Sequence, residues 1–371
     1  MAQETLEMNV NEQAPAFDPI KARLISKRRR VSLPQWATAW IVLIPALIFL
    51  VLFMFYPIIN TFLMAFIQDY AVVKGGGSFA LGNFLKLLAT PCQSYDKLAG
   101  ECVVYNTMPS FGFGNFAFLF TSQAKGFVDS IFNTMILVVV EVPLTIIIAL
   151  LLATFLNSIK AVKGLFQTIF FLPYVTNTIA LGLVFNMLFS SSDGGLINAL
   201  FNAVGLKPVQ WLSDTTDQNG IGKFTQGVVI VIYAVWNGLA FKILVFLSGL
   251  ATIDKQYTDA AKIDGSSSFT IWRRITLPLL SPQILYITIT SFIGAFKMYT
   301  GVRAVYVNQD PYYFGGMNGE TWMPVVGWIY RSLTQTEISQ GVAAAGSLVL
   351  LGIILLITLA QFAVSKRRVH Y

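Results

Sequence analysis

The chain has 371 residues, of which 55% are hydrophobic and only 12% are charged, and its formal net charge is +7. This balance excludes an ordinary water-soluble protein, in which about a quarter of the residues are charged. The positive charge requires no nucleic-acid partner, because the inner loops of membrane proteins are also basic.

Six apolar stretches are long enough to cross a hydrocarbon core of about 30 Å, which takes roughly 20 helical residues. They run from Ala37 to Asn60, Ile131 to Leu156, Leu165 to Phe189, Gly227 to Leu250, Ile284 to Val305 and Val342 to Val364. Helices are expected because each span must satisfy its own backbone hydrogen bonds in lipid, and the alternation of a membrane β-barrel is absent. The predicted fold is an all-α integral membrane protein with one span at residues 37–60 and a core at residues 131–364.

The distribution of Lys and Arg predicts the orientation. With both termini inside, the cytoplasmic segments hold 15 of the 25 basic residues, against 7 outside and 3 within spans. The positive-inside rule therefore favours two cytoplasmic termini, a polar tail at residues 1–36 and a basic tail at residues 365–371. We interpret the basic run Lys27–Arg30 as a topology anchor rather than as a site for lipid or nucleic acid. The N-terminal tail is expected to be disordered. The first span is not expected to be a removed signal peptide, because this polar tail precedes it and its apolar run is too long.

The first outer loop, residues 61–130, is unusually large and carries both cysteines, Cys92 and Cys102. On an oxidising face they can form a disulfide that closes a short loop; free or buried thiols are the open alternative. No metal site is expected, because the only histidine, His370, lies on the opposite side of the membrane in this topology.

The cytoplasmic segment 251–282 is too polar to lie in lipid and is expected to form two short helices. Asp254 is a candidate N-cap for a helix that runs through Ile263, and Gly265 can adopt the left-handed conformation that ends it. The serines at 266–268 offer N-caps for a second helix, which is predicted to stop before Pro278.

Two interpretations of this segment stay open on its chemistry alone. Ala260 and Ala261 leave one helix face without bulk, so that a partner protein can approach, and Asp264 can fix the angle of the turn. Alternatively, the segment is an amphipathic hairpin on the lipid headgroups, with Arg273 and Arg274 meeting anionic lipid.

The segment resembles the EAA loop of binding-protein-dependent ABC importer permeases, whose pattern is Glu-Ala-Ala, two residues, Asp-Gly-Ala, five residues, Phe, two residues, Ile, one residue, Leu-Pro. The chain matches it at Ala260, Ala261, Asp264, Gly265, Ile275, Leu277 and Pro278, and departs from it at Asp259, Ser266 and Trp272. Asp259 keeps the charge and Trp272 keeps an aromatic ring. The resemblance implies that Asp259, Ala260, Ala261, Asp264, Gly265, Trp272, Arg273, Arg274 and Pro278 belong to a loop that couples the chain to an ATPase.

Other short sequence motifs, spread over most of the chain, resemble those of the carbohydrate-importing, maltose-transporter-like branch of that family. It comprises Ile44-Pro45-Ala46-Leu47 with Tyr56-Pro57, Asn133-Thr134, Phe170-Phe171-Leu172-Pro173-Tyr174, Gly195-Leu196-Ile197-Asn198 and Trp211-Leu212-Ser213-Asp214. The resemblance implies the six-helix fold of a type I ABC importer permease, with residues 71–113 as an insertion in the enlarged first external loop.

The resemblance also implies the partners: a second homologous permease, two copies of an ABC ATPase, an extracytoplasmic solute-binding protein and a bacterial or archaeal cytoplasmic membrane. No cofactor is expected on this chain, because it lacks a Gly-x-x-x-x-Gly-Lys-Ser/Thr loop, and ATP and Mg would bind the ATPase subunits. The chain is therefore expected not to be an enzyme.

Charges within spans are costly and suggest functional or structural pairing. Glu141 is the most central. It can line the substrate path, pair with Lys242 or Lys297, or face the partner permease. Lys242, Lys297 and Arg303 lie toward the ends of their spans and are expected to extend to the headgroups.

Sugar recognition needs aromatic faces for apolar sugar surfaces, and amides or hydroxyls for the OH groups. Candidate substrate-path residues with this chemistry, together with the central carboxylate, are Glu141, Tyr233, Trp236, Asn237, Ser291, Tyr299 and Thr300. We predict a permease for a sugar or oligosaccharide, with glycerol phosphate or another polyol as alternative substrates. An ion-driven secondary transporter using Glu141 is the alternative mechanism, and a membrane enzyme is disfavoured because no cluster of catalytic groups is present.

Overall fold

A computed structural model describes residues 34–68, 70, 77–88, 122–159, 163–191, 195–212, 221–306, 313–315, 321–334 and 340–365. The chain divides into two compact units, Met1–Asn60 and Thr61–Tyr371. Within the described residues all regular elements are helices, apart from one isolated bridge between Ile67 and Phe79, which confirms the all-α prediction. The predictions for the basic run Lys27–Arg30, for Cys92 and Cys102, for His370 and for most of the insertion at 71–113 fall outside the described residues.

One long apolar helix begins in the first unit and ends in the first residues of the second. It begins with α2 (Gln35–Leu50), widens into the π-helical turn η1 (Val51–Phe55) and continues into α3 (Tyr56–Phe66). Pro57 lacks a backbone N–H, and the hydrogen bonding just before it shifts so that Tyr56 N donates to Val51 O. The helix from Trp36 to Phe66 is long and apolar enough to cross a membrane, in agreement with the predicted first span.

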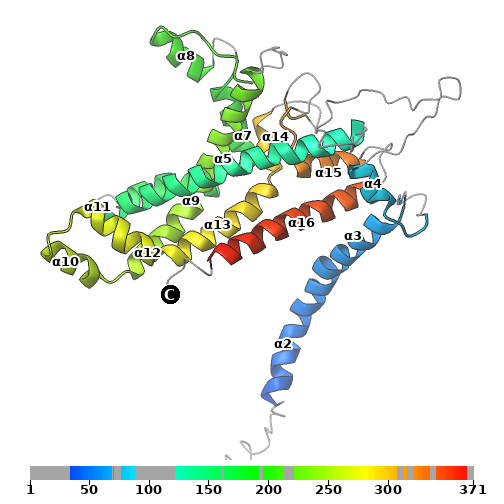
Figure 1. The fold of residues 1–371 in the computed structure, drawn as a ribbon, viewed down its shortest axis with the longest axis horizontal. Coiled ribbons are helices and arrows are strands. Elements are labelled where there is room, and N and C mark those ends of the chain that lie inside the picture. Colours follow the sequence, from blue (N-terminus) through cyan, green and yellow to red (C-terminus); the bar gives the residue numbers. More distant parts are fainter. Residues whose placement is uncertain are drawn as a thin grey trace, which may run out of the picture. The chain divides into compact units, whose positions relative to one another are not determined.

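Four long helices form the second unit. These are α5 (Ser122–Ser158), α9 (Ile221–Thr252), α13 (Ser281–Phe296) and α16 (Gln340–Ser365). α5 packs against α9 and α13, and α13 also packs against α16 (Figure 1). The apolar stretches of α5, α9 and α16 were predicted as spans, and each helix extends a few residues beyond the prediction.

The other two predicted spans are interrupted. The stretch from Leu165 to Phe189 forms α6 (Lys163–Val175) and α7 (Thr178–Leu188), which are separated where the Asn177 side chain caps α7 by accepting a hydrogen bond from Ile179 N. The stretch from Ile284 to Val305 forms α13 and the short α14 (Thr300–Val305). The described residues thus contain four helices able to cross a membrane, or five if the bent pair Ser268–Leu279 and Ser281–Phe296 forms one span, instead of six continuous ones.

The two short helices α7 and α14 approach each other closely. A Cβ atom on Gly182 would lie 2.2 Å from Cβ of Ala304, so only glycine leaves room for the Ala304 methyl group here. Asn186 Nδ2 also donates to Val305 O at 2.8 Å. This hydrogen bond gives the carbonyl of Val305, at the end of α14, a partner on α7.

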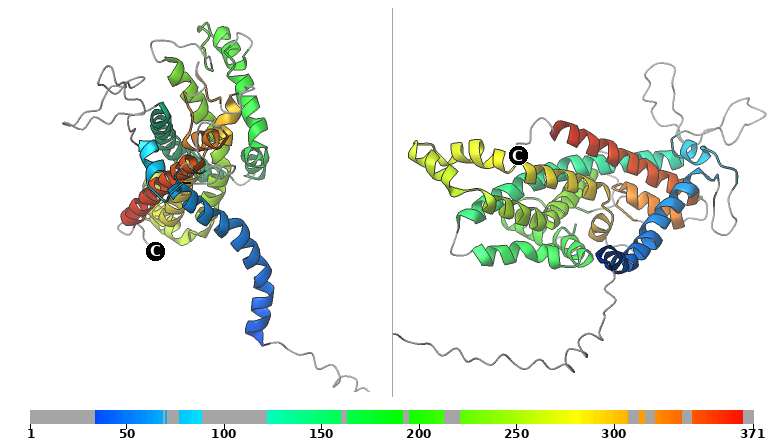
Figure 2. Two further views of the ribbon diagram at one scale, coloured as in Figure 1. Left: turned by 90° about the vertical axis from the view of Figure 1, so that its right-hand side faces the viewer. Right: turned by 90° about the horizontal axis from the view of Figure 1, so that it is seen from below.

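The two ends of the second unit differ in content. The polar segment with α10 (Lys255–Ile263), α11 (Ser268–Ile271), η2 (Trp272–Thr276) and α12 (Leu277–Leu279) lies at one end of the long helices, and α4 (Gly82–Leu88), α14 and α15 (Val325–Thr334) lie at the other (Figure 1 and Figure 2). α8 (Leu196–Ala203) follows α7. The buried helix α15 was not predicted, because it lies in a stretch interpreted as an outer loop.

Candidate functional site

The capping residues of the polar segment act as predicted. The Asp254 side chain accepts from Gln256 N at 3.0 Å, Gly265 has a φ of 77°, and Ser267 Oγ accepts from Thr270 N at 3.3 Å. The second helix does not stop before Pro278, however. It widens into η2 and continues through α12 to Leu279, and the wide π-helical turn accommodates the missing N–H of proline.

Most of the residues matching the coupling pattern are exposed. Asp259, Ala260, Asp264, Gly265, Arg273 and Arg274 all face outward, whereas Ala261, Trp272 and Pro278 are half-buried. Asp259 forms an exposed ion pair with Lys262 at 3.2 Å. Ile263, 87% exposed, and Phe269 flank the turn, and this apolar surface can bury against a protein or lipid partner.

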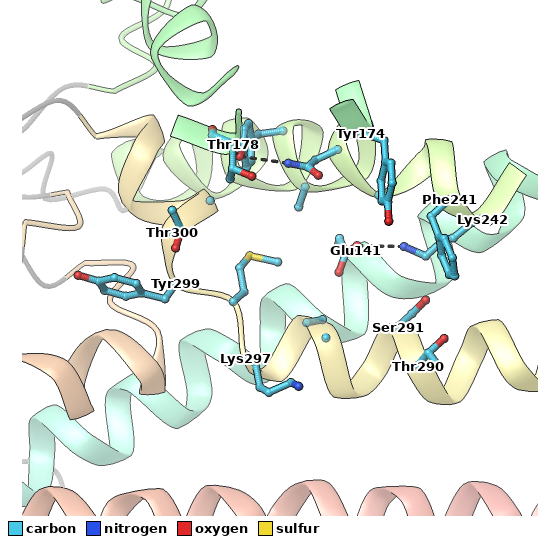
Figure 3. Close-up of a pocket in the computed structure, with 18 residues that line it drawn as sticks. Glu141, Tyr174, Thr178, Phe241, Lys242, Thr290, Ser291, Lys297, Tyr299 and Thr300 are labelled. Atoms are coloured by element: carbon cyan, nitrogen blue, oxygen red, sulfur yellow. Dashed lines mark hydrogen bonds and ion pairs between the residues drawn. The ribbon is translucent and has the colours of Figure 1, made fainter. Parts of the chain in front are cut away.

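A second site is a cavity of about 550 Å³ inside the helical bundle. Figure 3 shows side chains from α5, α6, α7, α9, α13 and the connection into α14 around it. Six of the seven predicted substrate-path residues line it: Glu141, Tyr233, Asn237, Ser291, Tyr299 and Thr300. Trp236 is not among the lining residues, and its side chain is 39% exposed.

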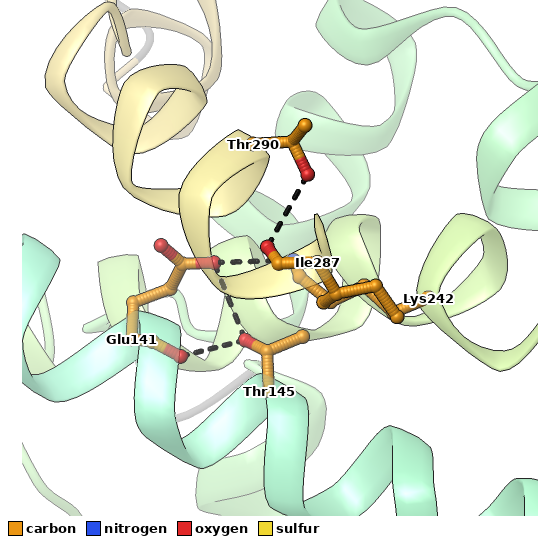
Figure 4. A network of polar contacts seen from close by, with 5 residues as sticks. All are labelled: Glu141, Thr145, Lys242, Ile287 and Thr290. Atoms are coloured by element: carbon orange, nitrogen blue, oxygen red, sulfur yellow. Dashed lines mark hydrogen bonds and ion pairs between the residues drawn. The ribbon is translucent and has the colours of Figure 1, made fainter. Parts of the chain in front are cut away.

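An ion pair between α5 and α9 forms one wall of this cavity. Lys242 Nζ lies 3.9 Å from Glu141 Oε1, and Thr145 Oγ1 donates to the same carboxylate oxygen at 3.2 Å (Figure 4). Lys242 is 7% exposed and Glu141 5%. The expectation that Lys242 reaches the headgroups is therefore wrong, because a buried ammonium needs the carboxylate close by.

Gly238 makes room for this ion pair. It lies one helical turn before Lys242, and a Cβ atom at this position would come within 2.7 Å of Lys242 Nζ. Glu141 Oε2 is buried and accepts no hydrogen bond from the described residues. Lys242 and Thr145 both interact with Oε1, so both lone pairs of Oε2 remain available to accept hydrogen bonds.

The opposite part of the lining is neutral and polar. Asn237 Nδ2 donates to Tyr233 Oη at 3.3 Å, and Tyr233 Oη donates to Thr178 O at 3.1 Å. Gly301 admits the Tyr233 ring, since a Cβ there would lie 2.8 Å from ring atom Cε1. The chain of hydrogen bonds holds the amide and the phenol at the edge of the cavity.

Sequence reasoning missed several lining residues, among them Tyr174, Thr178, Phe241, Thr290, Lys297 and Met298. The rings of Tyr174 and Phe241 stack at 6.3 Å. Tyr174 ends the run Phe170-Phe171-Leu172-Pro173-Tyr174, which supplied a signal without indicating where the side chain points. Lys297 lines the cavity and is exposed, and the Arg303 guanidinium donates to the carbonyl of Tyr306.

Two other runs noted in the sequence have structural roles near segments that were predicted as outer loops. Thr134 Oγ1 accepts from Val325 N at 3.0 Å, and Asn133 Nδ2 donates to Met323 O at 3.4 Å, so this pair ties α5 to the start of α15. Asn198 Oδ1 accepts from Trp211 Nε1 at 3.0 Å and from Val209 N at 3.0 Å. The side chain of Asn198 thereby holds the connection after α8 in shape.

No group of three or more His, Cys, Asp or Glu side chains able to hold a metal ion occurs in the part of the chain that the structure describes. The candidate sites are therefore the cavity beside Glu141 and the exposed segment α10–α12.

Comparison with known proteins agrees with this geometry. A family model described as "Binding-protein-dependent transport system inner membrane component" matches residues 116–370. The arabinooligosaccharides transport system permease protein AraP of Bacillus subtilis (strain 168) is 29% identical over 292 residues, covering 76% of this chain and 85% of the relative. The lactose transport system permease protein LacF of Rhizobium radiobacter is 30% identical over 267 residues, covering 71% and 74%.

The fold is also similar to a solved structure. A chain of a bacterial alginate ABC transporter, in complex with an alginate pentasaccharide-bound periplasmic protein, superimposes with a TM-score of 0.66 at 20% identity. The match covers 89% of this chain and 94% of that chain. It indicates a shared fold.

Proposed function

Because the chain belongs to the family of inner-membrane components of binding-protein-dependent transport systems, we propose that it is a permease subunit that carries a sugar or short oligosaccharide inward. The observation that carries this proposal is the cavity beside Glu141, which lies among the helices and combines aromatic rings with an amide, hydroxyls and a carboxylate. Such a lining suits a polyhydroxylated ligand, because each sugar OH group needs a partner once it leaves water.

Each part of the cavity has a distinct role in this proposal. Tyr174, Phe241 and Tyr299 offer ring faces to the apolar side of a sugar, and Asn237 offers an amide. Glu141 Oε2 accepts a hydrogen bond from a substrate hydroxyl, an interaction that the described residues leave unmade. The relatives named for arabinooligosaccharides and lactose support this substrate class.

The segment α10–α12 is the proposed docking site for a separate ATPase. Its exposed Ala260, Asp264 and Gly265 form a turn that a protein surface can approach closely, and Ile263 and Phe269 supply apolar contact. ATP and Mg would bind the ATPase subunits, and this chain would transmit their movement to the cavity. A second permease and a solute-binding protein complete the proposed assembly.

The ion-driven alternative has less support. Glu141 is held by Lys242 and Thr145 instead of standing alone in a midplane ion site. The family membership also favours a binding-protein-dependent importer. Both termini are proposed to lie in the cytoplasm, with the segment 251–282 on the same side and α15 on the outer side.

Uptake in cells tests the proposal. A strain lacking the gene is given radiolabelled arabinotriose, maltose, lactose or glycerol phosphate, with and without the restored gene. We expect restored uptake of one of the sugars, and competition by its unlabelled form. Uptake of glycerol phosphate alone would move the substrate class to polyols. Uptake that persists after the partner ATPase gene is removed would contradict the importer mechanism.

A further inference from the structure

A single polar link connects the candidate coupling segment with another helix. Trp272 Nε1 donates to Thr154 Oγ1 at 3.2 Å, and Thr154 Oγ1 donates in turn to Leu150 O at 2.8 Å. Among the described residues, no other hydrogen bond joins the stretch from Asp254 to Thr276 to a different long helix. The threonine hydroxyl thus bridges the indole N–H of Trp272 and a backbone carbonyl of α5.

Both partners of this link lead to the cavity. Thr154 lies on α5, thirteen residues after Glu141, which corresponds to about 20 Å along an unbroken helix. Trp272 continues through α12 into α13, which carries the lining residue Ser291. The hydrogen bond therefore joins α5 to the segment that leads into α13, and both helices line the cavity.

Packing around Trp272 is incomplete, which increases the importance of the polar link. A cavity of about 390 Å³ separates α10 from the ends of α5 and α9, and Thr154, Lys262 and Trp272 are among its lining residues. The indole packs on one side against the core cluster that includes Leu156 and Leu250. Apolar side chains can slide past one another without a large loss of contact, whereas a hydrogen bond holds its donor and acceptor at a defined distance and angle.

We propose that the Trp272–Thr154 hydrogen bond is a latch that makes α5 follow α11–α13, so that both walls of the cavity move together when the coupling segment is displaced. Trp272 acts here as a positioning residue that does not touch the substrate. The coupling pattern has Phe at this position, and phenylalanine has no N–H to donate. The latch rests on the proposed function, because it requires an ATPase that displaces the segment α10–α12.

Substitutions that remove the hydrogen bond test the latch, and Thr154→Val does so with the smaller change of side-chain volume. Trp272→Phe keeps an aromatic ring, and Thr154→Val keeps the side-chain shape without altering the docking surface. The reconstituted complex is assayed with the sugar selected in the uptake assay, as molecules carried per ATP hydrolysed. Each variant is expected to lower this ratio about 2- to 10-fold. The double variant should be no lower than either single one, because both remove the same interaction.

A matched control is Thr358→Val, since Thr358 Oγ1 bonds only to Ile354 O of its own helix α16 among the described residues. This variant should keep the ratio of the unmodified complex. An unchanged ratio in Thr154→Val, or additive losses in the double variant, would overturn the latch. Failure of the ATPase subunits to co-purify with the unmodified chain would instead overturn the proposed function.

A distance measurement tests the movement directly. Spin labels are placed at the exposed positions Leu151 on α5 and Tyr286 on α13, with Cys92 and Cys102 replaced by serine. The distance distribution is recorded without nucleotide and with ATP and orthovanadate. We expect one narrow distribution in both states for the unmodified pair, and a broader one after Thr154→Val. A narrow, unchanged distribution in that variant would contradict the latch.

Discussion

The end of the second unit that carries α4, α14 and α15, named the outer-loop end after its predicted loops, and the candidate coupling segment are held by different means. At the outer-loop end, Thr134 and Asn133 anchor the start of α15, and Trp322 Nε1 donates to Lys223 O at 2.8 Å beside the buried Gly227. The segment α10–α12 is largely exposed and is tied to α5 through Trp272. The first arrangement suits a fixed scaffold, and the second suits a segment that moves with a partner. The comparison implies that substitutions at the two ends should fail in different ways.

Overpacking the scaffold is expected to prevent the chain from accumulating. In Gly227→Val, the new Cβ would lie 2.4 Å from Trp322 Cζ2, and a buried indole that is also hydrogen-bonded has little room to move. Overpacking of this kind costs about 1–3 kcal/mol or more. We expect most of the protein to be lost from the membrane, measured by immunoblot and by size-exclusion chromatography in detergent.

The control for this substitution is Gly352→Val on α16, where a Cβ would meet nothing within 4 Å. It should accumulate at the level of the unmodified chain. Equal accumulation of both variants would mean that the α9–Trp322 contact is not a fixed part of the scaffold.

A second substitution separates folding from coupling. Gly265→Val places a β-branched residue at a φ of 77° in the exposed turn, which costs about 1–2 kcal/mol locally and redirects the turn. We expect normal membrane levels but at least a tenfold loss of uptake and reduced co-purification of the ATPase. The control is Gly205→Val, which imposes the same strain at a φ of 78° in the turn after α8, where a Cβ would also meet nothing within 4 Å. If both variants transported equally well, the turn at Gly265 would not be the docking site.

Two ion pairs among the described residues of the second unit give a third contrast. Glu141–Lys242 is buried, whereas Asp259–Lys262 is exposed on both sides. Lys242→Met leaves a buried carboxylate unpaired, at a cost of roughly 3–5 kcal/mol. The midpoint of thermal unfolding in detergent should therefore fall clearly in this variant. Lys262→Met should leave it almost unchanged, because exposed pairs contribute about 0–1 kcal/mol.

The double variant Glu141→Leu with Lys242→Met removes both charges and the carboxylate acceptor, and it should recover most of the lost thermal stability. Its uptake should stay low if Glu141 Oε2 accepts a hydrogen bond from the substrate. Full recovery of uptake would assign the pair a purely structural role.

The local features of the segment α10–α12 were predictable because their causes lie within a few residues. An Asp254 cap, a left-handed Gly265 and a Ser267 cap each depend on the next two or three backbone positions. The continuation past Pro278 was not, since it depends on the backbone widening into η2. Capping chemistry shows where a helix can end without requiring it to end there.

The interruptions of the spans required tertiary information. A hydropathy window averages over Asn177 and over residues 297–299, where the helices are interrupted, and it contains no information about the contact of Gly182 with Ala304. The cavity was easier to predict, because polar and aromatic residues are conspicuous in apolar spans. Tyr174 was missed because the direction of its side chain depends on the path of α6.

The smallest and most specific prediction uses two adjacent residues of α9. Successive residues point about 100° apart around a helix, so Asn237 lines the cavity while Trp236 does not. Asn237→Ala should raise the KM for uptake about 3- to 10-fold through loss of one hydrogen bond, with normal membrane levels. Trp236→Phe should leave the KM unchanged. The reverse result would place the substrate path on the Trp236 face of α9 and remove the cavity beside Glu141 as the binding site.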